Sequence, residues 1–323
     1  MTRNDQDLSL ISQDMEAVDA VIAARLTTNV ALIGQVAHYI ISAGGKRLRP
    51  AMLLLVAKAL GYQGQYHHEM AAVMEFIHTA TLLHDDVVDE STMRRGRPTA
   101  NQSFGNPASV LVGDFLHSRA FEMMVATGNI RVMQVVAAAT NIIAEGEVQQ
   151  LINMHDASLN EAGYLQVIRS KTAKLFEAST QVGAILAGAD AALEQAAAVY
   201  GQALGTAFQI IDDVLDYDGS AQEMGKNVGD DLREGKATLP LIVAMQRGDA
   251  QQARTVREAI EQGSVEQLEE VIAIVRSTGA LQVARECAQA EAQRALQALT
   301  AFPDNACTTA LKALPERLQA RRN

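Results

Sequence analysis

Two short groups of aspartates combine a residue type and a spacing that suit metal chemistry. Both follow the pattern D-D-x-x-D, and each closes an apolar stretch of the chain. The groups are Asp85, Asp86 and Asp89, and Asp212, Asp213 and Asp216. On a helix the first and fifth residues of this pattern share a face, so each group projects two carboxylates side by side. Such like charges repel, and divalent cations offset that cost. All-oxygen ligation favours Mg²⁺, which completes its shell with water and phosphate oxygens.

Basic side chains stand in the segments that adjoin the aspartates. They are Lys46 and Arg49 in the stretch GGKRLRP (44–50), Arg94 and Arg95 after the first group, Lys226 and Lys236 after the second, and Lys171 beside Thr172 between the two. Cations of this kind complete the neutralisation of phosphates that Mg²⁺ bridges. His78 precedes Asp85 by seven residues, which is two turns back on the same helix face. The sequence contains neither G-x-x-x-x-G-K-[ST] nor G-x-G-x-x-G, so nucleotide hydrolysis and dinucleotide binding are not supported.

The elements that carry these residues are expected to be helices. Long segments rich in Ala, Leu, Gln and Glu favour helix, and four of the six prolines stand just before apolar-periodic stretches, where a first-turn proline is tolerated. Alternating β-branched and aromatic residues bounded by turn signals are absent from the sequence, so strands are not expected. The expected helices are residues 14–42, 50–60, 68–90, 107–126, 130–149, 161–188, 192–217, 237–247, 251–262, 265–278, 280–300 and 305–320. Since no low-complexity linker divides the chain, the sequence predicts a single all-α domain over residues 1–323.

Composition narrows the class of protein. The chain of 323 residues is 48% hydrophobic with a formal net charge of −11, which argues against a disordered chain and against a nucleic-acid-binding protein. Two cysteines, Cys287 and Cys307, are too few for a disulfide framework and favour a reducing compartment. Residues 1–14 carry three aspartates and no apolar segment, and no stretch reaches the roughly 18 apolar residues of a membrane span. We therefore expect a cytoplasmic protein without a transmembrane segment.

Six motifs, all in the same order, resemble those of the trans-prenyltransferases, or polyprenyl diphosphate synthases. They are GGKRLRP (44–50), LLHDDVVDESTMRRGRPT (82–99), GDF (113–115), KTA (171–173), FQIIDDVLDY (208–217) and GKNVGDDLREGKATLP (225–240). The resemblance covers nearly the whole chain and implies antiparallel helices around a deep central cavity, the isoprenoid synthase type I fold. It also implies a homodimer that condenses farnesyl diphosphate head to tail, by 1'-4 linkage, with successive isopentenyl diphosphates. The all-trans polyprenyl diphosphate product would supply the side chain of respiratory quinones.

Carried onto this sequence, the resemblance assigns roles to individual residues. Asp85 and Asp89 would bind two Mg²⁺ ions and Asp212 a third, about three per active site, with Asp86 and Asp216 in support. The allylic diphosphate would contact Arg94, Lys171, Thr172, Gln209, Lys226 and Lys236, and the isopentenyl diphosphate would contact Lys46, Arg49, His78 and Arg95. Lys171, Thr172 and Gln209 would be catalytic. The Thr172 hydroxyl and the Gln209 carbonyl would direct oxygen dipoles toward the allylic cation that forms when the carbon–oxygen bond breaks.

Product length is predicted from small residues ahead of the first aspartate group. Ala80 and Thr81 lie five and four residues before Asp85, where the growing prenyl chain must pass into apolar space between helices. Short-chain members of the family tend to place aromatics there, or to insert two residues within the motif, and this chain does neither. Phe115, Phe121, Met123 and Met124 are candidates for closing the far end of such a tunnel. We therefore expect a product near C40, the alternative being a C15–C20 prenyl diphosphate synthase.

Two other classes of protein share some of these features. A terpene cyclase usually replaces the second D-D-x-x-D with an Asn/Ser/Glu metal triad and is richer in aromatics, whereas aromatics are 4% of this chain and tryptophan is absent. A non-catalytic subunit of the same fold typically loses an aspartate group or the basic loop, and this chain keeps both. The basic tail from Arg317 to Arg322 fits either a solvated helix end or a transient contact with anionic lipid during product release.

Overall fold

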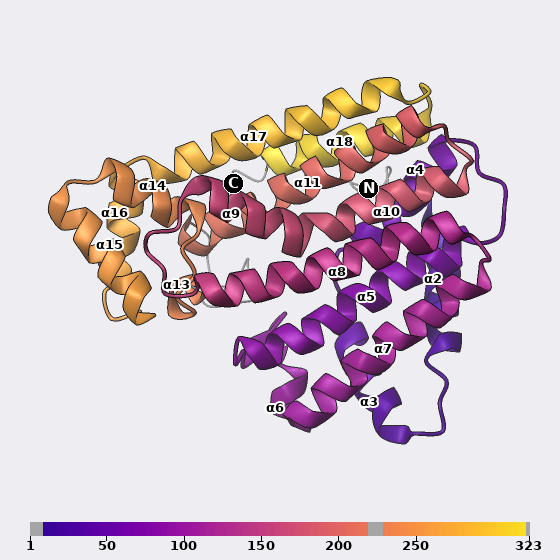
Figure 1. Ribbon diagram of the computed structural model, residues 1–323, viewed down its shortest axis with the longest axis horizontal. Coiled ribbons are helices and arrows are strands. Elements are labelled where there is room, and N and C mark those ends of the chain that lie inside the picture. The colour runs from indigo at the N-terminus through magenta and orange to yellow at the C-terminus, as the bar shows by residue number, and fades with distance from the viewer. Residues whose placement is uncertain (1–8, 219–228, 321–323) are drawn as a thin grey trace. The chain divides into compact units, whose positions relative to one another are not determined.

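Helices account for nearly all the regular structure in a computed structural model, which describes residues 9–218 and 229–320 (Figure 1). They are α2 (Ser12–Arg25), α3 (Ala31–Ser42), α4 (Leu48–Ala59), α5 (His67–Val88), α6 (Ala100–Phe104), α7 (Asn106–Ala126), α8 (Ile130–Asn153), α9 (Glu161–Ile168), the π-helical turn η1 (Arg169–Ala173), α10 (Lys174–Leu186), α11 (Ala191–Asp218), α13 (Asp230–Arg233), α14 (Leu239–Arg247), α15 (Ala250–Gln262), α16 (Leu268–Ser277), α17 (Ala280–Ala298), the 3₁₀ turn η2 (Leu299–Ala301) and α18 (Ala306–Ala320). The strands of the described residues are an antiparallel pair, β1 (Met93–Arg94) and β2 (Arg97–Pro98). The expected all-α class is confirmed.

Three details differ from the sequence-based expectation. The helix expected over residues 14–42 is two helices, α2 and α3. They are separated at Leu-Thr-Thr-Asn-Val (26–30), where β-branched and short polar side chains weaken a helix. Two short helices, α6 and α13, lie in segments where none was expected. The β1–β2 hairpin was also unexpected, because strands of two residues are too short to show an alternating pattern.

Local signals explain where other helices begin and end. Helix α7 starts with Pro107 in its first turn, directly after Gly105 at φ 85°. At the start of α15, the Asp249 carboxylate accepts from the Gln252 N–H at 2.9 Å, and the Gln252 side chain accepts in return from the Asp249 N–H at 2.9 Å. The same helix ends at Gly263, whose φ of 58° lies in the left-handed region that favours glycine.

The chain groups into two compact units, each with its own core. Unit 1 comprises Met1–Thr140, Leu175–Gly201 and Ala298–Leu314, and unit 2 comprises Asn141–Lys174, Gln202–Gln297 and Pro315–Asn323. In unit 1, α5 packs against α4 and lies alongside α7 (Figure 1). In unit 2, α14 packs against α9, α15 and α16. None of the described helices is long and apolar enough to cross a membrane.

Helix α4 forms the centre of the unit 1 core. Its residues 50–57 are all buried, so this helix is apolar on every side. Helix α10 approaches it closely at Gly183, where an added Cβ would lie 2.7 Å from the Leu53 carbonyl oxygen. The 44–50 loop runs into the first turn of this buried helix, which gives the basic residues of that loop a rigid base.

Candidate active site

The first aspartate group lies at the C-terminal end of α5. Asp85 and Asp89 are partly exposed, whereas Asp86 is buried. Arg94 binds Asp86, with its Nε and Nη2 atoms 2.8 and 2.7 Å from Oδ1. The side-chain amide of Asn101 donates to the backbone carbonyl of Asp86 at 3.1 Å. Burial raises the pKa of Asp86, and the Arg94 guanidinium opposes that rise. The group therefore leaves Asp85 and Asp89 accessible, while Asp86 anchors an arginine.

A tight hairpin sets the positions of the two adjacent arginines. Arg94 on β1 pairs with Arg97 on β2, and the turn between them holds Arg95 at φ 53° and Gly96 at φ 75°. Arg94 reaches Asp86, whereas Arg95 packs on Gly45 of the 44–50 loop. A Cβ added to Gly45 would lie 2.8 Å from Nη2 of Arg95. Glycine at this position thus makes room for a guanidinium group.

Arg95 belongs to a cluster of ionisable side chains in unit 1 with Arg49, Glu75 and His78. Burial lowers the pKa of Arg49 to about 10, while the negative charge of Glu75 acts in the opposite direction. Burial raises the pKa of Glu75, and the neighbouring arginines, Arg47 most strongly, oppose that rise. Burial also holds the pKa of His78 well below its ordinary value, and Arg49 and Arg95 add to this effect. His78 is therefore a neutral imidazole at pH 7 among cationic neighbours.

The environment of the Arg49 side chain indicates that this cluster can bind an anion. Its guanidinium carbon lies 4.3 Å from the centre of the Phe176 ring, so the ring holds one face of the group. Its Nε is buried and has no hydrogen-bond partner among the described residues. A buried donor without an acceptor costs free energy, and a bound oxyanion would satisfy it. In the same loop Lys46 is exposed, and Arg47 pairs with Asp19.

The second aspartate group lies near the C-terminal end of α11 in unit 2. Asp212 is exposed, whereas Asp213 is buried. The Tyr164 hydroxyl donates to Oδ2 of Asp213 at 2.5 Å, and the Gln209 amide donates to Oδ1 at 2.8 Å. Burial holds the pKa of Asp213 well above its ordinary value, and the negative charge of Asp231 acts in the same direction. The buried carboxylate here is bound by neutral donors, and Asp212 stays accessible.

The last aspartate of the second group has a structural contact. Asp216 is buried, and its Oδ2 accepts from the backbone N–H of Asp231 on α13 at 3.3 Å. The Asp216 carbonyl also accepts from the Gly229 N–H at 3.2 Å. Lys236 forms an ion pair with Glu234. Lys226, which the sequence also suggested, lies outside the described residues.

The π-helical turn η1 carries the remaining predicted residues of unit 2. Nζ of Lys171 lies 2.6 Å from Oε2 of Glu147 on α8. The Thr172 hydroxyl donates to Oε1 of Gln209 at 3.0 Å, which links the turn to Asp213 through Gln209. An added Cβ on Gly146 would lie 2.9 Å from the backbone nitrogen of Lys171, so α8 touches the turn directly. Single π-helical turns inside helices often mark functional sites.

The residues predicted to control product length lie on α5 and α7, which pack together. Ala80 is buried, and the Thr81 hydroxyl donates back to the His78 carbonyl at 2.8 Å. On α7, Met123 and Met124 are buried. Phe115 is partly buried with the Arg119 guanidinium 5.1 Å from its ring centre. Phe121, also partly buried, packs edge-on against His117 with centroids 5.1 Å apart. Six residues apart on a helix, the two phenylalanines point about 120° from each other.

Comparison with known proteins bears directly on these motifs. A family model described as polyprenyl synthetase matches residues 30–275. The chain is 52% identical over 303 residues to the octaprenyl diphosphate synthase of Escherichia coli (strain K12), and the match covers 94% of each chain. The chain belongs to the polyprenyl synthetase family.

Two further relatives of this polyprenyl synthetase extend the comparison. The chain is 48% identical over 305 residues to an all-trans-nonaprenyl-diphosphate synthase (geranyl-diphosphate specific) of Rhodobacter capsulatus, with 94% of each chain covered. A crystal structure of a polyprenyl synthase from Caulobacter crescentus CB15, complexed with calcium and isoprenyl diphosphate, is 44% identical with a TM-score of 0.95. That match covers 99% of this chain and 98% of the other. The expected isoprenoid synthase type I fold is confirmed. The family in general depends on Mg²⁺ and uses isopentenyl and allylic diphosphates.

The donor set of the aspartate groups fits the metal of a polyprenyl synthetase. The accessible ligands, Asp85, Asp89 and Asp212, are carboxylates, and hard oxygen ligands suit Mg²⁺ better than softer transition metals. Asp85 and Asp89 stand one helical turn apart, so both oxygen sets lie on the same side of α5. Asp86 is committed to Arg94 and Asp216 to the backbone of α13, which limits both to support.

Four residues that touch the predicted site were missed in the sequence. They are Glu75, Glu147, Tyr164 and Asp231. Glu75 had a signal, because it precedes His78 in an E-x-x-H spacing, although that pattern alone points to di-iron bundles, which need a second copy. Asp231 also had one, because it lies within the motif GKNVGDDLREGKATLP. Nothing in the sequence near Tyr164 or Glu147 marks either as a partner of Asp213 or Lys171.

Proposed function

We propose that this chain is a Mg²⁺-dependent trans-prenyltransferase that makes a long-chain polyprenyl diphosphate, octaprenyl diphosphate at about C40. The observation that carries the proposal is the presence of two D-D-x-x-D groups, both with accessible first aspartates, together with the arginine cluster of unit 1. The relatives support a long product, since one makes an octaprenyl and another a nonaprenyl diphosphate by their names. The product would serve as the side chain of respiratory quinones.

In this proposal four cationic side chains bind the allylic diphosphate. Arg94, Lys171, Lys226 and Lys236 would contact its oxygens. Bound at Asp85, Asp89 and Asp212, about three Mg²⁺ ions would neutralise the diphosphate as its carbon–oxygen bond breaks. Because Arg94 already binds Asp86, this arginine is oriented before substrate arrives, which lowers the cost of ordering it. That both aspartate groups serve one diphosphate rests on the family motifs.

Residues of the π-helical turn η1 would stabilise the allylic cation that remains when the diphosphate leaves. The Thr172 hydroxyl and the Gln209 carbonyl direct oxygen dipoles toward the allylic carbon without forming a bond to it. Their mutual hydrogen bond of 3.0 Å, and the bond from Gln209 to Asp213, fix both side chains in one network. The π electrons of isopentenyl diphosphate attack the allylic C1, a proton leaves its C2, and the departing diphosphate accepts that proton.

The arginine cluster of unit 1 would bind the isopentenyl diphosphate. Arg49 and Arg95 offer guanidinium groups beside the neutral imidazole of His78, and Lys46 adds an exposed ammonium in the same loop. Glu75 offsets part of the arginine charge when no substrate is present. The unpartnered Nε of Arg49 would gain an acceptor on binding.

Product length would be set along α5 and α7. Ala80 and Thr81 leave space for a prenyl chain near its start, and Phe115, Phe121 and Met123 are proposed to limit it farther on. An Ala80→Phe variant should therefore shorten the product. Unchanged length in that variant would contradict the tunnel assignment.

The remaining expectations are proposals about the whole protein. We propose that residues 1–323 act as one catalytic domain, that the active form is a homodimer, and that it works in the cytoplasm with a transient membrane contact when the product leaves. Cys287 and Cys307 are free thiols, in keeping with a reducing compartment. Size-exclusion chromatography with light scattering tests the dimer.

The experiment that tests this function is elongation with purified chain, Mg²⁺, labelled isopentenyl diphosphate and either farnesyl or geranyl diphosphate as primer. Products are resolved by chain length. We expect a dominant product near C40 from farnesyl diphosphate. A C15 or C20 product would keep the enzyme class and overturn the proposed length, and no elongation with either primer would contradict the proposal.

A further inference from the structure

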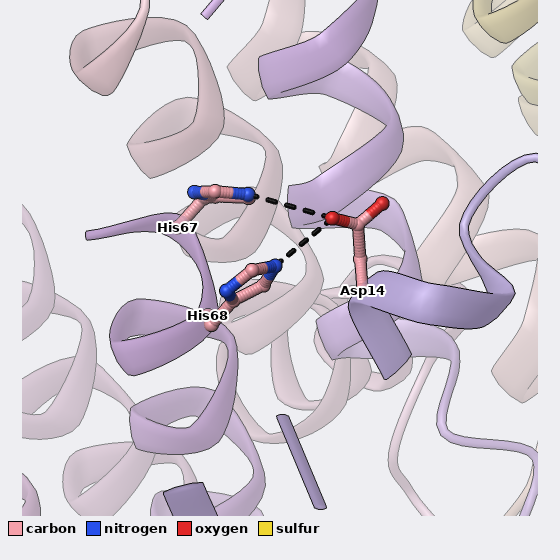
Figure 2. A group of neighbouring side chains, drawn as sticks. All are labelled: Asp14, His67 and His68. Atoms are coloured by element: carbon pink, nitrogen blue, oxygen red, sulfur yellow. Dashed lines mark hydrogen bonds and ion pairs between the residues drawn. The ribbon is translucent and has the colours of Figure 1, made fainter. Parts of the chain in front are cut away.

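Three side chains outside the proposed active site converge on one point in unit 1 (Figure 2). Asp14 lies in the first turn of α2, and His67 and His68 are the first two residues of α5. Nε2 of His68 lies 2.9 Å from Oδ1 of Asp14, and Nε2 of His67 lies 3.5 Å from the same oxygen. The two imidazole rings stack at a tilt of 38° with centroids 3.9 Å apart. We call these residues the Asp14–His67–His68 triad.

Hydrogen bonding alone does not explain this arrangement well. One carboxylate oxygen faces two imidazole nitrogens, and the contact to His67 is at the outer limit of a hydrogen bond. Nδ1 of His67 is buried and has no hydrogen-bond partner among the described residues. The edge of the Tyr62 ring, with its centroid 5.3 Å from that of His67, restricts the imidazole to its present orientation. The His67 ring is thus held in place by packing with its Nε2 aimed at the carboxylate.

Two of the three separations between donor atoms suit a tetrahedral metal ion, and all three atoms lie within 4.8 Å of one another. Donors bound to Zn²⁺ at about 2.1 Å stand about 3.4 Å apart, and the two Asp14–histidine distances of 2.9 and 3.5 Å bracket that value. The side chains are 15%, 16% and 26% exposed for Asp14, His67 and His68, so an ion can enter and a water molecule can complete its shell. Two imidazoles and one carboxylate are donors that zinc accepts and that Mg²⁺ does not favour.

A neighbouring lysine, Lys58, binds one of the two carboxylate oxygens of Asp14. Nζ of Lys58 lies 2.6 Å from Oδ2 of Asp14 and also donates to the Leu10 carbonyl at 3.1 Å. Lys58 therefore occupies one oxygen of Asp14 and leaves Oδ1 for the histidines, so the carboxylate would bind an ion through one oxygen. The ammonium charge also weakens attraction for a cation, which makes the site a moderate binder rather than a tight structural one.

We propose that the Asp14–His67–His68 triad is a binding site for a divalent transition metal of the Zn²⁺ type, separate from the Mg²⁺ sites of the aspartate groups. To bind the ion, each neutral imidazole carries its proton on Nδ1, which leaves Nε2 free as the ligand atom, and a water molecule is the fourth ligand. Because the ligands come from α2 and from the start of α5, the ion cross-links the first described helix of the chain to the helix that carries Asp85.

Zinc titration by calorimetry tests the site in the full-length chain. The background carries Cys287→Ser and Cys307→Ser, so that free thiols do not bind the probe, and contains millimolar Mg²⁺ to fill the aspartate groups. We expect one Zn²⁺ per chain, with affinity lowered at least about tenfold by His68→Gln and by Asp14→Asn. His38→Gln, which changes an exposed histidine on α3, is the matched control and should bind as the parent does.

Co²⁺ provides a second readout that does not depend on affinity alone. Bound to the triad, it should give the intense visible absorption of a four-coordinate site with nitrogen ligands, and that absorption should disappear in His68→Gln. Circular dichroism of each variant checks that the fold is retained. Equal Zn²⁺ affinity in His68→Gln, Asp14→Asn and His38→Gln would overturn the proposal. So would loss of all Zn²⁺ binding in the parent when Mg²⁺ is added.

Discussion

The two aspartate groups share a spacing but differ in what binds their second residue. In unit 1, Asp86 is held by the Arg94 guanidinium, a charged partner from a hairpin that follows it closely in the chain. In unit 2, Asp213 is held by the hydroxyl of Tyr164 and the amide of Gln209, which are neutral. The first group thus fixes the position of a guanidinium beside its two accessible carboxylates. The second group orients the neutral side chains of Tyr164 and Gln209. Any positive charge near this group must come from other residues.

The fifth residues differ as well. Asp89 is the C-terminal cap of α5 and is partly exposed, whereas Asp216 is buried and accepts from the backbone of α13. Two carboxylates of the first group are therefore accessible, and in the second group Asp212 is the accessible one. The same motif therefore offers two accessible metal ligands in the first group, Asp85 and Asp89, and one in the second group, Asp212.

The accessible carboxylates give the largest expected effect. Asp85→Asn and Asp212→Asn should each lower kcat/KM by about 10²–10³, because each removes a charge that holds a cation against the developing diphosphate. Initial rates of isopentenyl diphosphate incorporation measure this. Asp304→Asn, at an exposed aspartate that belongs to neither group, should have the activity of the unmodified chain. Full activity in Asp212→Asn would break the proposed role of the second group.

The partners of the buried aspartates should differ in their effect on rate. Arg94→Gln removes a cation as well as an anchor, so kcat/KM should fall by about 10²–10³. Tyr164→Phe removes one hydrogen bond worth roughly 1 kcal/mol, so kcat/KM should fall about fivefold.

A matched control for Tyr164 lies in unit 1. The Tyr200 hydroxyl is also buried and donates to the Leu311 carbonyl at 2.7 Å. Tyr200→Phe should therefore cost similar stability, about 1 kcal/mol, and leave activity unchanged. If Tyr164→Phe lowered activity no more than Tyr200→Phe does, the hydrogen bond from Tyr164 to Asp213 would not contribute to catalysis.

Substitutions of the last aspartate in each motif, Asp89 and Asp216, should differ in their effect on stability rather than on reaction rate. Asp216→Ala removes the buried carboxylate that accepts from the partly buried Asp231 N–H and should lower the free energy of unfolding by about 1–3 kcal/mol. Asp89→Ala removes a negative charge at a helix C-terminus, so stability should stay constant or rise by about 0.3–1 kcal/mol. Urea unfolding without Mg²⁺ measures both. Equal destabilisation by the two changes would mean that the contrast in burial has no energetic consequence.

The smallest expected effect is a pH trend in the arginine cluster. Burial raises the pKa of Glu75 above its ordinary value of 4.5, so the folded state binds this proton more tightly than the unfolded state does. The stability that comes from the bound proton is complete below pH 4.5 and is lost as pH rises through the folded-state pKa. The unmodified chain should therefore lose stability relative to Glu75→Gln as pH is raised from about 5 to 7. Urea midpoints at several pH values measure the difference, and an opposite slope would contradict the burial of this carboxyl.

Helix ends were predictable where local chemistry marks them. Pro107 and the capping box at Asp249 put the starts of α7 and α15 within one residue of expectation. The break between α2 and α3 was missed because it contains neither glycine nor proline. The π-helical turn η1 was missed for another reason, because Arg-Ser-Lys-Thr-Ala suits an ordinary helix as well. Contact with Gly146 of α8 accompanies the altered turn, and that contact has no trace in the local sequence.

In the candidate site, too, contacts between residues close in sequence were predictable, and contacts between distant residues were not. Asp86 and Arg94 are eight residues apart, so the motif that predicts one predicts the other. Tyr164 and Asp213 are 49 residues apart, and only folding brings them into contact. The burial of Asp216 was likewise unpredictable, because its spacing matches that of Asp89 and its environment does not. The sequence therefore suggested the residues proposed to do chemistry more readily than the side chains that hold them.

The central claim is that both aspartate groups act on the same allylic diphosphate. A double-mutant cycle on binding tests it most directly, with calorimetric titration of the unreactive analogue farnesyl thiodiphosphate in Mg²⁺ against the unmodified chain, Asp85→Asn, Asp212→Asn and the double variant. If one diphosphate is shared, the losses will be non-additive by about 1 kcal/mol or more. Losses that add to within about 0.5 kcal/mol would mean that the two groups act independently, and would contradict the claim.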